Sequence, residues 1–173
     1  MNFFKPYFYF LFFSFGLFFN SCASIDDERI PNFPVNISIS DAGMWNIYGV
    51  SGFGSNKNFI LSLNLPSGFP YSSKSATGFG GVLLIEGIDP FSANTSIPLA
   101  YDLACPVERK ADIRVKVSEE TFAAICPECH SAYDVTMQRG APISGPAATG
   151  KYKYALKSYS CVPSGLGGFY ISN

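Results

Sequence analysis

Histidine and charge are both scarce in this chain. His130 is the only histidine among 173 residues, and charged residues make up 14% of the sequence. A single histidine that stands among cysteines leaves no Ser/His/Asp arrangement for nucleophilic catalysis, and no pair of carboxylates stands out as a hydrolytic site. The net charge of −1 lacks the basic excess that a nucleic-acid partner requires. The sequence therefore gives no positive sign of an enzyme and predicts no nucleic-acid partner.

Sustained helical periodicity is also missing. No stretch of ten residues carries apolar side chains at the i, i+3, i+4 spacing of an amphipathic helix, and the 16 glycines and 12 prolines argue against a helical bundle. Short apolar or alternating segments occur instead, separated by turn clusters. They are 35–40, 59–65, 82–86, 99–103, 112–118, 152–159 and 169–171. This pattern predicts an all-β fold, an antiparallel sandwich or small barrel.

Two of these segments predict which side chains face the core. In 112–118 the alternation places Ile113, Val115 and Val117 inward and the charged residues between them outward. In 59–65 the leucines at positions 61, 63 and 65 share one face of a strand. We therefore expect a half-buried strand in each segment.

The longest uncharged apolar run is too short to span a membrane comfortably. Residues 7–19 would make a helix of about 20 Å, against a hydrocarbon core of about 30 Å. Lys5 precedes the run and Asn20-Ser21-Cys22 follows it, as in a signal peptide. A small residue directly before a cysteine at this place resembles the lipobox of bacterial lipoproteins, whose cysteine is acylated and becomes the new N-terminus. The alternative is an ordinary secretory signal with an incidental cysteine.

The lipoprotein resemblance divides the chain into three segments. Residues 1–21 are predicted to be the signal peptide, 22–34 a lipidated tether and 35–173 the folded domain. Several acyl chains on Cys22 would anchor the protein durably to a membrane. The acidic residues 26–28 resemble the surface-export signals of some Gram-negative lipoproteins. We therefore expect a protein of the cell envelope, anchored in the outer membrane on its periplasmic or surface face.

Four cysteines remain for the folded domain, in an exported protein where disulfides are permitted. Cys105 precedes the predicted strand 112–118, and Cys126 and Cys129 follow it. In a meander, both cysteine-bearing loops would emerge at one end of the same sheet, which is how a small β domain holds a metal. Cys161 is interpreted as a small buried hydrophobe and not as a ligand.

These loops and the segment after them resemble the Rieske iron–sulfur domain. In that family one loop reads Cys-x-His, and a second reads Cys-Pro-x-His-Gly followed by an aromatic residue and Asp. A proline-bearing loop then covers the cluster. The matching segments here are 104–108, 125–135 and 140–148, and the resemblance covers residues from about 80 to 160. It implies a Rieske-like β fold that carries an electron-transferring [2Fe–2S] cluster on the two loops.

The expected ligand set departs from that family at two positions. A Rieske cluster is held by two cysteines on one iron and two histidines on the other. Cys105 and Cys126 match the two cysteines, whereas Val107 stands where the first histidine belongs and Cys129 where the second does. His130 occupies the glycine position. Because valine has no donor atom, the family's ligand set cannot form and the site is predicted to be degenerate.

Four interpretations of Cys105, Cys126, Cys129 and His130 stay open. The favoured one is loss of the cluster with a disulfide in its place, either Cys105–Cys126 or Cys126–Cys129. The second is a metal centre, an atypical [2Fe–2S] cluster or zinc, on the three cysteines and His130. The third is c-type haem, because Cys126-Pro-Glu-Cys129-His130 has the C-x-x-C-H signature. The fourth is a thiol–disulfide exchanger, which lacks its usual βαβ context.

The expected function follows from the degenerate site. We expect a non-catalytic structural or interaction module of the envelope, with an unidentified protein partner and no cofactor. A small electron-transfer protein with an atypical [2Fe–2S] or zinc centre is the alternative.

Overall fold

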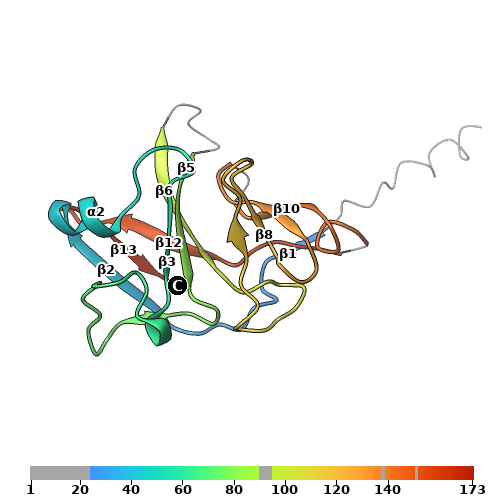
Figure 1. Cartoon of the computed structure of the whole chain (residues 1–173), viewed down its shortest axis with the longest axis horizontal. Coiled ribbons are helices and arrows are strands. Elements are labelled where there is room, and N and C mark those ends of the chain that lie inside the picture. The colour runs from blue at the N-terminus through green and yellow to red at the C-terminus, as the bar shows by residue number, and fades with distance from the viewer. Residues whose placement is uncertain (1–23, 90–94, 138, 151) are drawn as a thin grey trace, which may run out of the picture.

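Three β-sheets make up most of the regular structure in the computed structural model, which describes residues 24–89, 95–137, 139–150 and 152–173 (Figure 1). The largest is an antiparallel sheet that curls into a nearly closed barrel. In spatial order its strands are β3 (Asn56–Phe59), β5 (Val82–Ile88), β6 (Ser96–Asp102), β12 (Ser158–Pro163), β13 (Gly167–Ser172), β2 (Val35–Asp41) and β4 (Ala76–Thr77). The prediction of an all-β fold is confirmed.

The cysteine-bearing part of the chain forms a second, four-stranded antiparallel sheet. Its strands in spatial order are β10 (Ala141–Ser144), β9 (Ala132–Asp134), β8 (Ala123–Ile125) and β7 (Lys116–Val117). A parallel pair, β1 (Ser24–Asp26) and β11 (Tyr152–Tyr154), joins the start of the described chain to the segment that follows this sheet.

The predicted signal peptide and Cys22 lie outside the described residues. Within the described part, no helix is long and apolar enough to cross a membrane. The part of the predicted tether that is described packs on the domain: β1 pairs with β11, Ile30 is buried, and the guanidinium of Arg29 lies 3.8 Å from the ring centroid of Tyr154. Residues 24–30, which were predicted to belong to the tether, therefore pack against the domain.

Strand β5 separates two hydrophobic cores and contributes side chains to both. Residues 82–85 are all fully buried, and their side chains alternate between the two faces of the sheet. Val82 and Leu84 join one core, whereas Leu83 and Ile85 join the other. Because both faces are covered, the strand is a continuous apolar run instead of an alternating one. The core that contains Leu83 also contains Cys105 and Cys126 and extends to the four-stranded sheet.

One short helix, α2 (Ala42–Tyr48), follows strand β2 and was not predicted. With seven residues, it is too short to show apolar i, i+3, i+4 spacing over ten residues. The side chain of Asp41 caps it by accepting a hydrogen bond from the N–H of Met44 at 3.0 Å. Trp45 packs against Phe169 of β13, with ring centroids 4.5 Å apart. An N-cap aspartate after an alternating strand is thus the only sequence signal for this helix.

The prediction of a half-buried strand over 59–65 is wrong beyond Phe59. The chain forms a 3₁₀ turn at Leu61–Leu63, and Ile60 and Leu65 exchange backbone hydrogen bonds of 2.9 and 3.1 Å across it. The leucines at 61, 63 and 65 are 41%, 56% and 39% exposed. Closing the turn prevents the extended backbone that would have placed these leucines together on a buried face.

Two other predicted segments form only in part. Val115 is fully buried and Ile113 and Val117 pack against the same core, as expected, but the strand in 112–118 is limited to β7. The segment 152–159 divides into β11 and the start of β12, which belong to different sheets. In 112–118 periodicity thus identified the inward side chains correctly, but it could not determine which sheet each segment joins.

Candidate metal centre

The two cysteine-bearing loops belong to different sheets. Cys105 follows β6 of the seven-stranded sheet, whereas Cys126 and Cys129 lie in the turn between β8 and β9 of the four-stranded sheet. The expectation that both loops leave the same sheet is therefore wrong. They still face each other, because the chain after Cys105 returns to form a bridge between Arg114 and Ala104 and then continues into β7 of the second sheet.

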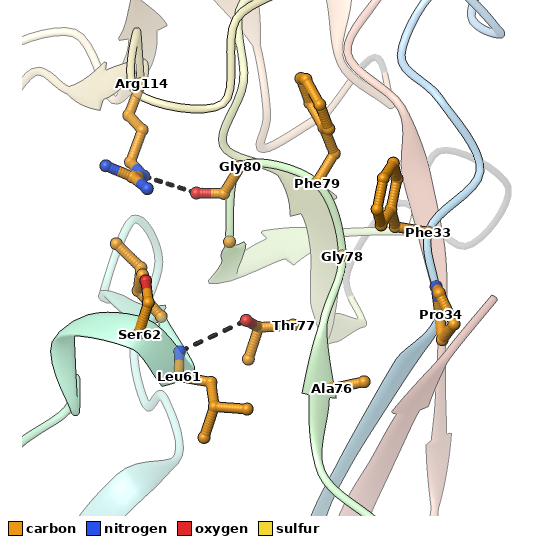
Figure 2. A pocket seen from close by; sticks show the side chains of 12 residues that line it. Phe33, Pro34, Leu61, Ser62, Ala76, Thr77, Gly78, Phe79, Gly80 and Arg114 are labelled. Carbon is orange, nitrogen blue, oxygen red and sulfur yellow. Dashed lines mark hydrogen bonds between the residues drawn. The ribbon is translucent and has the colours of Figure 1, made fainter.

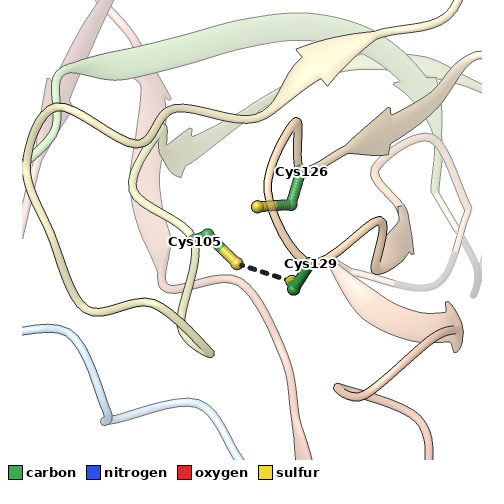
Figure 3. Close-up of side chains that lie close together, drawn as sticks. All are labelled: Cys105, Cys126 and Cys129. Carbon is green, nitrogen blue, oxygen red and sulfur yellow. Dashed lines mark hydrogen bonds between the residues drawn. The ribbon is translucent and has the colours of Figure 1, made fainter.

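Three thiols meet between these loops (Figure 3). The sulfur atoms of Cys105 and Cys129 are 3.6 Å apart, and those of Cys105, Cys126 and Cys129 all lie within 4.8 Å of one another. Cys105 and Cys126 are buried and Cys129 is partly buried, and all three are free thiols. Three sulfur atoms at these separations could share one metal ion.

The two loops are built alike. The carbonyl of Cys105 accepts a hydrogen bond from the N–H of Arg109 at 2.9 Å, and the carbonyl of Cys126 accepts one from the N–H of His130 at 3.1 Å. Arg109 and His130 both adopt the left-handed backbone conformation, with φ of 55° and 57°. Each cysteine therefore stands at the base of a closed i to i+4 turn, which fixes the direction of its side chain.

His130 does not join the three thiols. Its side chain is exposed, and the group of closely spaced ligand atoms contains only the sulfurs of Cys105, Cys126 and Cys129. The left-handed conformation at residue 130 reverses the chain immediately after Cys129. Of the four predicted site residues, the structure therefore brings three together and leaves the imidazole outside.

Two hydroxyl groups lie next to the sulfurs, and neither was predicted as part of the site. The hydroxyl of Tyr133 is 3.4 Å from the Cys105 sulfur, and the Cys129 thiol donates to the Ser131 hydroxyl at 3.2 Å. Both side chains are fully buried. Burial raises the pKa of Tyr133 far above its ordinary value, and the neighbouring Cys105 adds to this effect. Tyr133 therefore remains a neutral phenol beside the thiols.

The segment 140–148, predicted to cover the site, lies against the second cysteine loop. The N–H of Ala147 donates to the Ser131 hydroxyl at 3.0 Å, and Ala147 is fully buried in the same core as Cys105 and Cys126. A Cβ atom at Gly145 would lie 2.7 Å from the Cα atom of Ser131. This close approach explains a glycine here, because no larger residue fits without displacing the loop.

The buried carboxylate of Asp102, which was not predicted as part of the site, holds the start of the Cys105 loop by hydrogen bonds. Asp102 accepts hydrogen bonds from the N–H groups of Phe79, Gly80 and Ala104 at 3.0, 3.0 and 2.7 Å and from the Tyr159 hydroxyl at 2.6 Å. Burial raises the pKa of Asp102, and the hydrogen bonds from Tyr159 and the backbone oppose this rise. An aspartate at the end of an apolar strand was the available sequence signal.

Two of the thiols are weakly acidic, and one of these two lies outside the three-thiol group. Burial raises the pKa of Cys126 to about 12, although hydrogen bonds from the backbone N–H groups of Cys129 and Glu128 lower it in part. Burial also raises the pKa of Cys161 to about 12, with a smaller contribution from the charge of Glu86. Cys161 packs against the other core and does not belong to the three-thiol group. The fourth cysteine of the domain is therefore not a fourth ligand.

A separate cavity of about 380 Å³ is lined in part by the glycine-rich segment 78–81 (Figure 2). Arg114 is the one ionisable residue in its lining, and its Nε donates to the carbonyl of Gly80 at 2.5 Å. Phe33 and Phe79, with ring centroids 5.6 Å apart, and the exposed Leu61 also line it. No cysteine lines this cavity, so it is distinct from the thiol centre.

A [2Fe–2S] cluster of the Rieske type does not fit the residues present. Such a cluster needs two imidazoles on its second iron, whereas Val107 has no donor atom and packs against the core, and His130 is exposed. What the arrangement offers is a set of three sulfur ligands. In comparisons with protein-family models, characterised proteins and solved structures, nothing matches this chain.

Proposed function

We propose that the chain is a lipid-anchored protein of the cell envelope whose Rieske-like domain has a degenerate cluster site and acts as a non-catalytic module. One observation carries this proposal: three thiols and no imidazole meet where the two loops face each other. The side chain of Val107 packs against the hydrophobic core that contains the cysteines. The position of the missing histidine is thus filled with an apolar side chain and not with a replacement ligand.

The test is the composition of the mature protein, purified from its membrane with detergent and without added metals. We expect a colourless protein with no stoichiometric iron and with an absorption spectrum that contains only the aromatic band. A brown protein that contains iron and labile sulfide in equal amounts would contradict the proposal. A Soret band with a covalent mass increment would contradict it in favour of haem at Cys126 and Cys129.

A small electron-transfer protein with an atypical centre is the second candidate. The observation that favours it is the third thiol, Cys129, which stands where the family has a histidine and lies 3.6 Å from Cys105, sulfur to sulfur. Reconstitution of the reduced protein with ferrous iron and sulfide tests it. This candidate predicts a stable paramagnetic signal on reduction of the product, which Cys129→Ser abolishes and Cys161→Ser retains.

A further inference from the structure

We infer that Cys105, Cys126 and Cys129 form a three-coordinate site for one thiophilic cation, and that this cation is copper(I). The inference rests on the proposed degenerate site and names the ligand that the site takes. It concerns a mononuclear ion held by sulfur alone, not the cluster that the family resemblance implies.

The chemistry of the donor set selects the class of ion. Among the described residues, the only groups whose ligand atoms lie within 4.8 Å of one another here are the three thiols, with no carboxylate and no imidazole. Thiolates are soft ligands that favour copper(I), zinc and iron–sulfur centres over magnesium, calcium or manganese. The site is therefore built for a soft ion.

The separations match a single ion at the centre. With metal–sulfur bonds of about 2.3 Å, three sulfur atoms around one ion lie about 3.8–4.0 Å apart. The Cys105 and Cys129 sulfurs are 3.6 Å apart, and no pair in the group exceeds 4.8 Å. Small rotations of the side chains are enough to bring all three sulfurs to bonding distance.

The number of ligands separates copper(I) from zinc. Structural zinc sites use four protein ligands, and zinc held by three keeps an open position for water. Here the side-chain hydroxyls of Tyr133 and Ser131, both neutral and fully buried, lie beside the sulfurs. The surrounding core is apolar, so water in a fourth position would lie in an unfavourable environment. Copper(I) is satisfied by three thiolates and needs no fourth ligand.

The protein around the sulfurs prepares the site. Both cysteine turns are closed by backbone hydrogen bonds, so little order must be gained when the ion binds. Cys129 is the one ligand of the three that is not fully buried. Each thiol that binds releases its proton to water, and no electron is transferred.

The experiment is an anaerobic titration of the reduced mature protein with copper(I) in competition with bathocuproine disulfonate. We expect one copper(I) per chain, and X-ray absorption should find sulfur neighbours only. Cys129→Ser should weaken binding by at least about 100-fold. Cys161→Ser is the matched control, because it removes a partly buried thiol that lies outside the group, and it should leave the affinity unchanged. Circular dichroism of both variants shows whether each remains folded.

Three results would overturn the inference. One is equal loss of affinity in Cys161→Ser and Cys129→Ser, the second is tighter binding of zinc than of copper(I), and the third is the absence of copper(I) binding by the reduced wild type. If the purified protein is colourless and free of iron in each case, the degenerate site stands and only the copper assignment fails. If the protein contains an iron–sulfur cluster, the proposed function fails as well.

Discussion

The carboxylate of Asp102 ties the Cys105 loop to two other parts of the chain. It is fully buried, and its donors come from Ala104 next to Cys105, from the segment 78–81 and from Tyr159 of β12. When such an acceptor is removed, its donors stay buried without a partner, which is more costly than losing an exposed hydrogen bond. One side chain therefore determines where the first cysteine loop begins.

We expect Asp102→Asn to destabilise the protein by about 2 kcal/mol. The NH₂ group of the new asparagine would face N–H groups that donate hydrogen bonds to the carboxylate in the wild type. At least one of these N–H groups would therefore lose its acceptor. Urea unfolding followed by circular dichroism measures the change. Asp112→Asn is the control, because Asp112 is exposed, and it should change the free energy of unfolding by less than about 0.5 kcal/mol. Equal effects of the two substitutions would contradict the role of Asp102.

His130→Gly should stabilise the protein by about 0.5–1 kcal/mol, because glycine adopts the left-handed conformation of this residue without steric strain. The substitution should leave copper(I) affinity unchanged, since the imidazole lies outside the thiol group. Thermal unfolding and the competition titration measure the two effects. Arg109→Gly, at the equivalent position of the first loop, is the matched control for stability. A clear loss of copper(I) affinity in His130→Gly would show that the imidazole is a ligand.

For single residues, the sequence revealed which ligand atoms are available but not where the side chains lie in the fold. Compared with the family motif that these loops resemble, the absence of a ligand atom at Val107 and the presence of a thiol at Cys129 follow from the residue types. The exposure of His130 could not, because it depends on the backbone conformation of that residue. Ser131 was likewise not predictable as a neighbour of Cys129, since their contact requires the closed turn.

The β8–β9 turn and the loop after β6 come from two sheets, and a sulfur pair only 3.6 Å apart crosses from one to the other. That pair is Cys105 and Cys129, which is neither of the two disulfides expected from the sequence. Both expected pairs involve Cys126, because the family resemblance places Cys105 beside Cys126 and because Cys126 and Cys129 are close in sequence. The closeness of this pair depends on how the two sheets pack, and a single sequence does not contain that information in readable form.

Oxidation of the metal-free protein with oxidised glutathione should join Cys105 to Cys129, with two electrons passing to the glutathione disulfide. Such a cross-link across the intervening loop should stabilise the protein by about 3 kcal/mol. Peptide mapping under non-reducing conditions identifies the pair, and Cys126→Ser should still form it. A dominant Cys126–Cys129 ring in the wild type would contradict this expectation.

Gly145→Ala should destabilise the four-stranded sheet by more than backbone strain alone. The added Cβ atom would meet the Cα atom of Ser131 at 2.7 Å, in a residue with φ of 77°. Gly52→Ala is the matched control, because Gly52 has φ of 89° but no atom within 4 Å of an added Cβ. We expect Gly145→Ala to lose at least about 1 kcal/mol more than Gly52→Ala in urea unfolding. Equal losses of unfolding free energy in the two variants would mean that the second cysteine loop shifts away from the added Cβ atom at no cost.

Strand prediction succeeded where burial alone determines the pattern. The segments 35–40 and 82–86 form strands as predicted, because the first buries one face and the second both faces. It failed in 59–65, where Ile60 and Leu65 form backbone hydrogen bonds with each other and the leucines between them stay exposed. Local alternation does not distinguish a strand from a turn that closes on itself.

The arrangement of the complete domain depends on contacts between distant parts of the chain. The parallel pair of β1 and β11 joins the first described residues to a segment near the C-terminus. No periodicity in residues 24–26 predicts this partner, and the sequence pattern indicated only a solvated tether. The general fold class was accessible from the sequence, whereas the assignment of strands to three separate sheets was not.

Cys22→Ser should release the protein from the membrane fraction, because the acyl chains on that cysteine are the proposed anchor. Fractionation and the mass of the mature N-terminal peptide measure the effect. Cys161→Ser, which removes another thiol of the chain, should leave the protein in the membrane. Retention of Cys22→Ser at the membrane, or a wild-type peptide without acyl mass, would contradict lipidation.

With the proposed lipid on Cys22, the pairing of Ser24 with β11 would limit how far the thiols lie from a bilayer. Two residues of chain reach at most about 7 Å, so a lipid on Cys22 would hold β1 and β11 at the headgroups. The N–H of Tyr154 in β11 donates to the carbonyl of Ala147, and Ala147 donates to Ser131 beside Cys129. On the proposals that Cys22 is lipidated and that the three thiols bind copper(I), the ion would therefore be gained and lost close to the lipid surface.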